Sequence, residues 1–162
     1  MIVLAGSLML AFYRSWETSV IFTDELLIED AAYSMAKSAS ILVPSVGGQV
    51  YLAKQPLLYW LHTPLYLIFS PQPWMIRIWM VIFAVLLVST IYLLSKFWFG
   101  EKVAILAAVF FALSWPFVYY TKTGNFDLPN AFFTTLTIYF YNRASKSVVL
   151  NIFMTVSLAL GI

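Results

Sequence analysis

The sequence predicts an all-α integral membrane protein with several transmembrane helices. Hydrophobic residues make up 62% of the 162 residues and charged residues only 10%, whereas an ordinary globular domain has about 25% charged residues. A soluble fold would therefore have too little polar surface. Apolar stretches that approach or exceed the ~20 residues of a membrane span recur along the chain. The absence of cysteine excludes a disulfide framework and a cysteine-ligated zinc site.

The first apolar stretch, residues 1–13, is shorter than a complete span. We interpret it as part of a span, because it lacks the basic start of a signal peptide. Residues 14–74 are expected to form an outer loop that contains interfacial helices. A helix is predicted from Thr23, because polar residues recur on one of its faces. These residues are Asp30, Ser34, Lys37 and Ser38. Such a helix is expected to lie along the membrane surface rather than across it.

The helical pattern then breaks at Pro44 and at the pair Gly47 and Gly48. The residue before a proline avoids the αR region, and glycine accepts positive φ. The next apolar stretch, residues 56–70, is only fifteen residues long and contains His62. This length predicts an interfacial or re-entrant piece rather than a span, and we interpret His62 as a packing or interfacial residue rather than a ligand.

Three spans are predicted next, over residues 75–98, 103–121 and 128–142, and a partial span over 148–162. Arg77 flanks the first of them. Basic residues then gather on one side of the membrane, at Lys96, Lys102, Arg143 and Lys146. Six of the seven acids gather on the other, at Glu17, Asp24, Glu25, Glu29, Asp30 and Asp127. Because short loops rich in lysine and arginine stay cytoplasmic, the acidic segments are predicted to face outward, at the cell (inner) membrane.

Each charged candidate has two open interpretations. Asp24 and Glu25 fit the first turn of a helix, where the helix dipole favours acids, and Asp127 fits an N-cap before Pro129. Lys54 fits an interfacial anchor with a snorkelling stem. The alternative is that these residues form a site at the outer face. Pattern alone does not decide between the two.

The order of the motifs supports the site. An Asp24-Glu25 pair is followed by Leu-Val-Pro at 42–44, Gly-Gly-Gln-Val-Tyr at 47–51, Lys-Gln-Pro-Leu-Leu-Tyr-Trp at 54–60 and Asp-Leu-Pro at 127–129. This series resembles the polyprenyl-phosphate-sugar-dependent membrane glycosyltransferases of the GT-C type, which include the protein mannosyltransferases and aminoarabinose transferases (glycosyltransferase family 39). The resemblance extends over nearly the whole chain. It implies that residues 1–162 are the N-terminal part of one GT-C-like transmembrane domain.

The resemblance implies an enzyme that moves a sugar from a polyprenyl-phosphate donor to a lipid or protein acceptor at the outer, periplasmic face, with inversion. Asp24 would be the catalytic base, Glu25 its support and Asp127 a second carboxylate. Lys54, Tyr51 and Tyr59 would bind substrate. The implied partners are the donor, the acceptor and membrane lipids, with no nucleic acid. The sugar and the acceptor are not identified by the sequence.

The chain departs from the family pattern at three places. No basic residue follows the acidic pair near Leu26, Ala53 stands where the family has an acid, and Gln55 replaces a proline. No cofactor is therefore predicted, since the loss at Ala53 leaves a divalent metal without support. Two other classes of protein remain as alternatives: a transporter fragment, which predicts acids inside spans, and a non-catalytic subunit of a membrane assembly, which needs no convergence of the charged residues.

Overall fold

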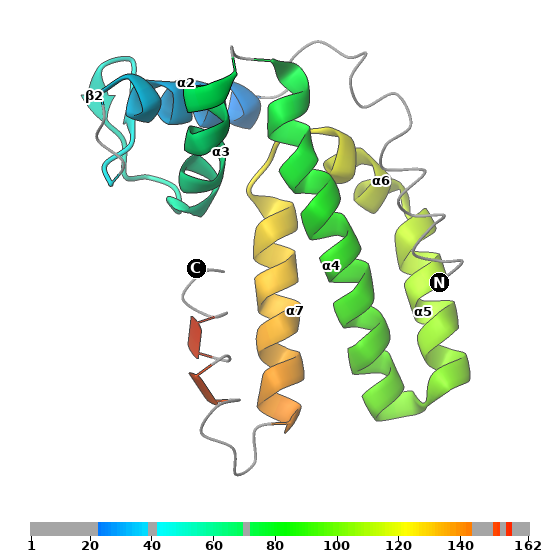
Figure 1. Cartoon of the computed structure of the whole chain (residues 1–162). Coiled ribbons are helices and arrows are strands. Elements are labelled where there is room, and N and C mark those ends of the chain that lie inside the picture. Colours follow the sequence, from blue (N-terminus) through cyan, green and yellow to red (C-terminus); the bar gives the residue numbers. More distant parts are fainter. Residues whose placement is uncertain (1–22, 39–41, 70–71, 144–150, 153–154, 157–162) are drawn as a thin grey trace.

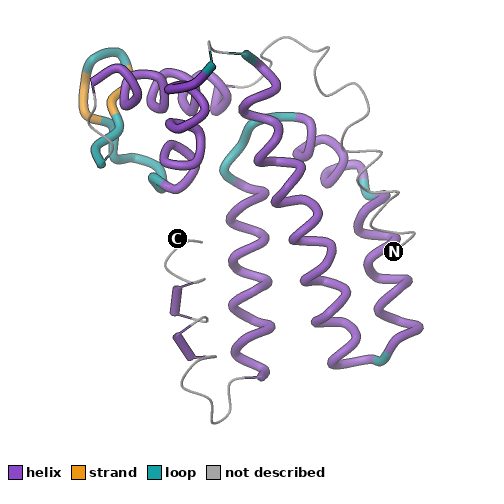
Figure 2. The backbone as a smooth tube through the Cα atoms, in the orientation of Figure 1, coloured by secondary structure: helices purple, strands orange, loops and turns teal. Residues whose placement is uncertain are grey.

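The computed structural model describes residues 23–38, 42–69, 72–143, 151–152 and 155–156. The predicted partial spans over 1–13 and 148–162 lie outside these residues, apart from two short helical pieces near the C-terminal end, as do Glu17 and Lys146. The described part is almost entirely helical (Figure 2). It consists of a bundle of long helices and a smaller layer that lies across one end of the bundle (Figure 1).

The bundle is formed by α4 (Pro73–Phe99), α5 (Glu101–Leu113) and α7 (Asp127–Arg143), which run side by side. In α4, the segment Trp74–Phe99 is long and apolar enough to cross a membrane, in agreement with the predicted span over 75–98. Large apolar side chains are exposed along α4 and α5, as contact with lipid tails requires. They include Ile78, Ile82, Leu86, Leu93, Phe97, Ile105, Leu106 and Phe110.

The residues of the predicted span over 103–121 form two helices rather than one. The chain bends by 58° between α5 and α6 (Trp115–Lys122). Ser114 is extended at ψ 139°, and Pro116 occupies the first turn of α6, where its missing N–H costs no hydrogen bond. The two helices count as a second span only when taken together, and α7 does not pass the same test in the described residues. The sequence predicts several membrane crossings. Among the described residues, one straight helix is long and apolar enough to cross a membrane.

The layer at the end of the bundle contains α2 (Thr23–Ser38) and α3 (Leu57–Ile68). The predicted amphipathic pattern of α2 is confirmed: Ile28, Ala31, Ala32 and Met35 are buried, whereas Asp30, Lys37 and Ser38 are exposed. With twelve residues, α3 is about 18 Å long and too short to cross a bilayer, as predicted for residues 56–70.

His62 connects α3 to α4. Its imidazole is fully buried, with Nδ1 2.5 Å from the carbonyl oxygen of Leu58 and Nε2 3.4 Å from that of Ile76. Burial lowers the pKa of His62, against the raising effect of the two carbonyl groups. The interpretation of His62 as a packing residue is therefore confirmed.

A two-stranded antiparallel hairpin joins α2 to α3. Strands β1 (Ser45–Val46) and β2 (Gln49–Val50) pair through a two-residue turn at Gly47 and Gly48, with φ values of 59° and 79°. The carboxylate of Asp30 accepts a hydrogen bond from the N–H of Gly47 at 2.7 Å, which fastens the hairpin to α2. Positive φ at this glycine pair was predicted, but the hairpin was not, although Gly-Gly between short apolar strands is a known signal for one.

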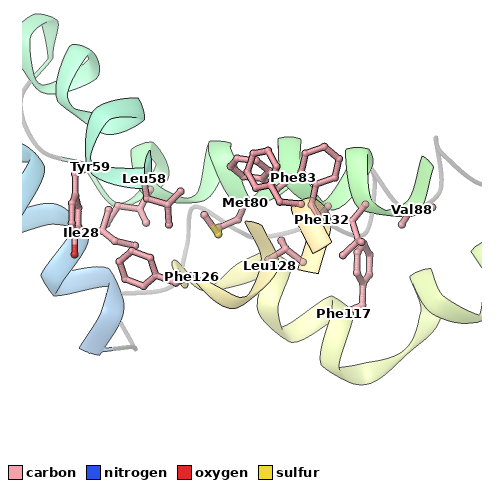
Figure 3. Close-up of a cluster of buried hydrophobic side chains, with 14 of the residues drawn as sticks. Ile28, Leu58, Tyr59, Met80, Phe83, Val88, Phe117, Phe126, Leu128 and Phe132 are labelled. Atoms are coloured by element: carbon pink, nitrogen blue, oxygen red, sulfur yellow. The ribbon is translucent and has the colours of Figure 1, made fainter. Parts of the chain in front are cut away.

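One hydrophobic core runs from the layer into the bundle (Figure 3). Ile28 of α2 and Leu58 of α3 belong to the same buried cluster as Met80 and Phe83 of α4 and Phe132 of α7. The ring of Phe83 lies 5.8 Å from those of Phe132 and Phe133. Because the core is shared, the position of the layer on the end of the bundle is fixed by packing.

Within the described part, the basic and acidic residues that the sequence assigns to opposite sides of the membrane lie at opposite ends of the bundle. The turn between α4 and α5 and the C-terminal end of α7 carry Lys96, Lys102 and Arg143, at the end opposite to the layer. The layer and the start of α7 carry Asp24, Glu25, Glu29, Asp30 and Asp127. Lys96 forms an exposed ion pair with Glu101 across the turn.

Candidate functional site

A hollow of about 560 Å³ opens where the layer meets the start of α7. It is lined by the segment 52–57 before and at the start of α3, by Trp60 on α3, and by Phe126, Asp127 and Asn130. The structure therefore brings together two of the charged residues singled out in the sequence, Lys54 and Asp127, which lie 73 positions apart in the chain.

Lys54 is exposed, and its ammonium nitrogen lies 5.2 Å from the centre of the Phe126 ring. Phe126 packs edge-on against Tyr59, with 5.8 Å between the ring centres. A cation over an aromatic face is attracted by the ring quadrupole, so this buried pair of rings holds the ammonium at the hollow. The ammonium contacts an aromatic residue of the site rather than simply extending into the interface.

Asp127 begins α7 and is exposed at the hollow. Of the two open interpretations of Asp127, the N-cap is not the one that the structure supports, because the side-chain cap comes from Asn125. The amide oxygen of Asn125 accepts a hydrogen bond from the N–H of Leu128 at 2.9 Å, and its nitrogen donates to the carbonyl groups of Tyr120 and Thr123 at 2.8 and 2.5 Å. The carboxylate of Asp127 lies in the first turn, where the helix dipole favours it.

Asp24, Tyr51 and Tyr59 lie close to one another but do not line the hollow. Tyr59 is fully buried, and burial, together with the charges of Tyr51 and Asp24, raises its pKa. Its hydroxyl has no hydrogen-bond partner among the described residues. A buried hydroxyl without a hydrogen-bond partner costs free energy. Tyr59 lies near the half-buried carboxylate of Asp24.

Glu25 has a different environment from Asp24. Its side chain is only 1% exposed, and its Oε1 accepts hydrogen bonds from the N–H of Gly124 at 2.6 Å and from Nε of Arg77 at 3.3 Å. Arg77 is itself 2% exposed. The interpretation of Arg77 as a flank of the first span is therefore incomplete: it belongs to α4 but forms a buried ion pair with the layer.

Sequence reasoning missed Trp60, Asn130, Arg77, Gly124 and Asn125. A signal existed for Arg77, since an ionisable residue near the start of an apolar helix points to a partner nearby. Trp60 ends the motif at 54–60, but no local pattern marks it or the other three as lining or supporting a site. Among the described residues, no group of three or more His, Cys, Asp or Glu side chains is placed to hold a metal ion.

Comparisons with known proteins show which family and which fold the chain resembles. The family model described as dolichyl-phosphate-mannose-protein mannosyltransferase matches residues 53–162. A protein of Aquifex aeolicus (strain VF5), described as uncharacterized, is 30% identical over 142 residues, which cover 87% of this chain and 28% of that protein.

Two crystal structures of ArnT from Cupriavidus metallidurans share the fold. The structure bound to undecaprenyl phosphate has a TM-score of 0.81 at 16% identity and covers 96% of this chain. The apo structure has a TM-score of 0.79 at 18% identity with the same coverage. The chain spans 28–30% of the length of these proteins. Since the family model covers well over half of the chain, the chain belongs to the dolichyl-phosphate-mannose-protein mannosyltransferase family.

Proposed function

We propose that the protein to which this chain belongs transfers a sugar from a polyprenyl-phosphate donor to a lipid or protein acceptor. The observation that carries the proposal is the hollow that Lys54 and Asp127 share. Asp24 does not line it, but lies near Tyr59, whose ring packs against Phe126 at its wall. Family membership supports the same chemistry. A lipid-linked donor also explains why the site would lie at the end of an apolar bundle, where a phosphate meets the membrane surface.

The reaction needs one base and one cation. The acceptor oxygen attacks the anomeric carbon, and the bond from that carbon to the phosphate oxygen breaks with its electron pair leaving on the phosphate. The proton of the acceptor goes to the carboxylate of Asp24. The leaving phosphate is already anionic near neutral pH and needs no general acid. Attack from the face opposite to the phosphate inverts the anomeric configuration.

The other residues have supporting roles in this proposal. The ammonium of Lys54 neutralises charge that develops on the departing phosphate. Asp127 orients the acceptor from the wall of the hollow. Tyr51 and Tyr59 do not line the hollow and contribute to binding indirectly, because the ring of Tyr59 packs against Phe126, over which the ammonium of Lys54 lies. Glu25 supports Asp24 rather than contacting substrate, because it is buried and bonded to Gly124 and Arg77.

The site is proposed to face outward. The basic residues Lys96, Lys102 and Arg143 lie at the other end of the bundle, and basic ends of membrane helices stay on the cytoplasmic side. The layer of α2 and α3 would then rest on the outer surface of the cell membrane. Its apolar helix α3 is too short to cross the membrane.

The test is a transfer assay with a labelled lipid-linked sugar and the full-length protein. Asp24→Asn keeps the shape of the side chain but cannot take the proton, so turnover should fall by about 10²–10⁴-fold while donor binding survives. Lys54→Ala should weaken donor binding as well as rate. Lys54→Arg should recover part of the activity, because it restores charge with a different geometry. Asp127→Asn should have an intermediate effect.

The matched control is Lys102→Ala, which removes an exposed lysine from the opposite end of the bundle and should leave turnover unchanged. The proposal fails if Asp24→Asn and Lys54→Ala both keep transfer rates within about twofold of the parent at equal protein levels. Retained rates, or no transfer by the parent, would favour a transporter or a non-catalytic subunit.

A further inference from the structure

The carboxylate of Glu25 joins three elements that are far apart in the chain. Its Oε1 is bonded to the backbone N–H of Gly124, 99 residues away, and to Nε of Arg77, 52 residues away. Glu25 belongs to α2, Arg77 to α4, and Gly124 to the turn between α6 and α7. All three residues are buried. We call this group of three the junction.

The junction requires glycine at position 124 for steric reasons. A Cβ built there would lie 2.3 Å from Cγ2 of Ile76 and 2.7 Å from Cγ of Glu25. Both distances are shorter than any ordinary carbon contact, and Ile76 is packed in the core. A side chain at this position would therefore displace the carboxylate that the backbone N–H now holds.

The two hydrogen-bond donors to Glu25, Nε of Arg77 and the N–H of Gly124, act on its carboxylate in different ways. Arg77 compensates the charge of Glu25, since a carboxylate this deeply buried is stable only when it is paired. The N–H of Gly124 belongs to a turn that the side-chain hydrogen bonds of Asn125 stiffen, so it specifies where the carboxylate lies. Glu25 follows Asp24 directly, and Gly124 precedes Asp127 by three residues.

We propose that Arg77 and Gly124 are positioning residues. They act through Glu25 to hold the base Asp24 at a fixed position relative to Asp127 and the hollow. The inference rests on the proposed function of the site. According to this inference, a buried ion pair and a glycine set the distance between two carboxylates that belong to α2 and α7. A misplacement of about 1 Å can lower a rate by about 10²-fold.

The experiment compares three variants of the full-length protein in the transfer assay. Glu25→Gln keeps an acceptor oxygen at the junction and should retain kcat to within about tenfold. The double variant Glu25→Met with Arg77→Met removes the acceptor without leaving an unpaired charge. It should remain folded, as judged by size-exclusion chromatography, and lose about 10²-fold in kcat with the donor KM within about threefold. The control is Glu29→Met, one turn further along α2 and half-buried, which should keep kcat.

Gly124→Ala breaks the junction from the other side without changing any charge, so it should also lower kcat by about 10²-fold. Combined with Glu25→Met and Arg77→Met, it should lower kcat by no more than about threefold further, because both changes disrupt one interaction. Multiplied losses would indicate separate structural damage and overturn the inference, as would full kcat in any folded variant that lacks the junction.

The two proposals fail separately. If Asp24→Asn is harmless, the proposed function is wrong. If Asp24→Asn and Lys54→Ala abolish transfer while Gly124→Ala and the double variant remain fully active, the site is catalytic but the junction does not position it.

Discussion

Removing Arg77 alone should destabilise the protein strongly. In the Arg77→Met variant, Glu25 stays buried at 1% exposure and loses the guanidinium that is paired with it. At the 3.3 Å between Nε and Oε1, Coulomb's law with an effective dielectric constant of about 20 gives an attraction of about 5 kcal/mol. Measured costs of breaking one side of a buried pair are about 3–5 kcal/mol. We therefore expect the free energy of unfolding to fall by an amount in that range.

Equilibrium unfolding of the full-length protein in mixed micelles, with increasing SDS, measures this loss. The double variant Glu25→Met with Arg77→Met should recover most of it, because no unpaired charge remains and two apolar side chains fill the space. Lys96→Met serves as the control, since its ion pair with Glu101 is exposed and should contribute little. A loss below about 1 kcal/mol in Arg77→Met would refute the reasoning, because a buried carboxylate cannot lose its cation at so small a cost.

Three further predictions concern sidedness, pH and the unpartnered hydroxyl. In this cysteine-free chain, a cysteine at exposed Gln49 should react with an impermeant thiol reagent from outside the cell and one at exposed Lys102 should not; the reverse pattern would overturn the orientation. The pKa of Glu29 is raised in the folded protein, first by burial and then by Glu25 and Asp30. Its charged form therefore lowers the free energy of unfolding when the pH is above the folded pKa. This loss disappears as the pH falls below the unfolded pKa near 4.5. Glu29→Gln should thus raise the unfolding temperature at pH 7 but not at pH 4, and equal shifts at both would contradict it. Tyr59→Phe should leave the free energy of unfolding unchanged or slightly higher, because the hydroxyl has no described partner; a loss above about 1 kcal/mol would reveal one.

Local patterns predicted the local features of the fold. The polar stripe on α2 and the apolar length of α4 are properties of consecutive residues, so they are visible in the sequence. The bend after α5 was missed, although Pro116 marks it, because a hydropathy pattern averages over a break of one residue. The hairpin at Gly47 was missed because its strands are only two residues long, below the length at which alternation is recognisable.

The candidate site was predicted only as far as its motifs extend. The order of the motifs predicted Lys54 and Asp127 as site residues, and both line one hollow in the structure. The pairing of Glu25 with Arg77 could not be predicted, because no sequence pattern around either residue specifies a partner 52 positions away. Asn125 was overlooked for the opposite reason: Asp127 fits the local signature of a cap equally well, and only the three-dimensional turn shows which of the two side chains serves.

Asn125 caps α7 and Asp127 does not, so the two positions should tolerate substitutions to different degrees. Because Asn125 supplies the hydrogen bond that starts α7, most replacements of exposed Asp127 should leave the amount of folded protein nearly unchanged, whereas replacements of Asn125 should reduce it. A library of all substitutions at both positions, sorted once for abundance in the membrane and once for activity, would separate the two kinds of constraint. Any restriction on position 127 would then reflect chemistry alone, because the fold places almost no demand on that side chain.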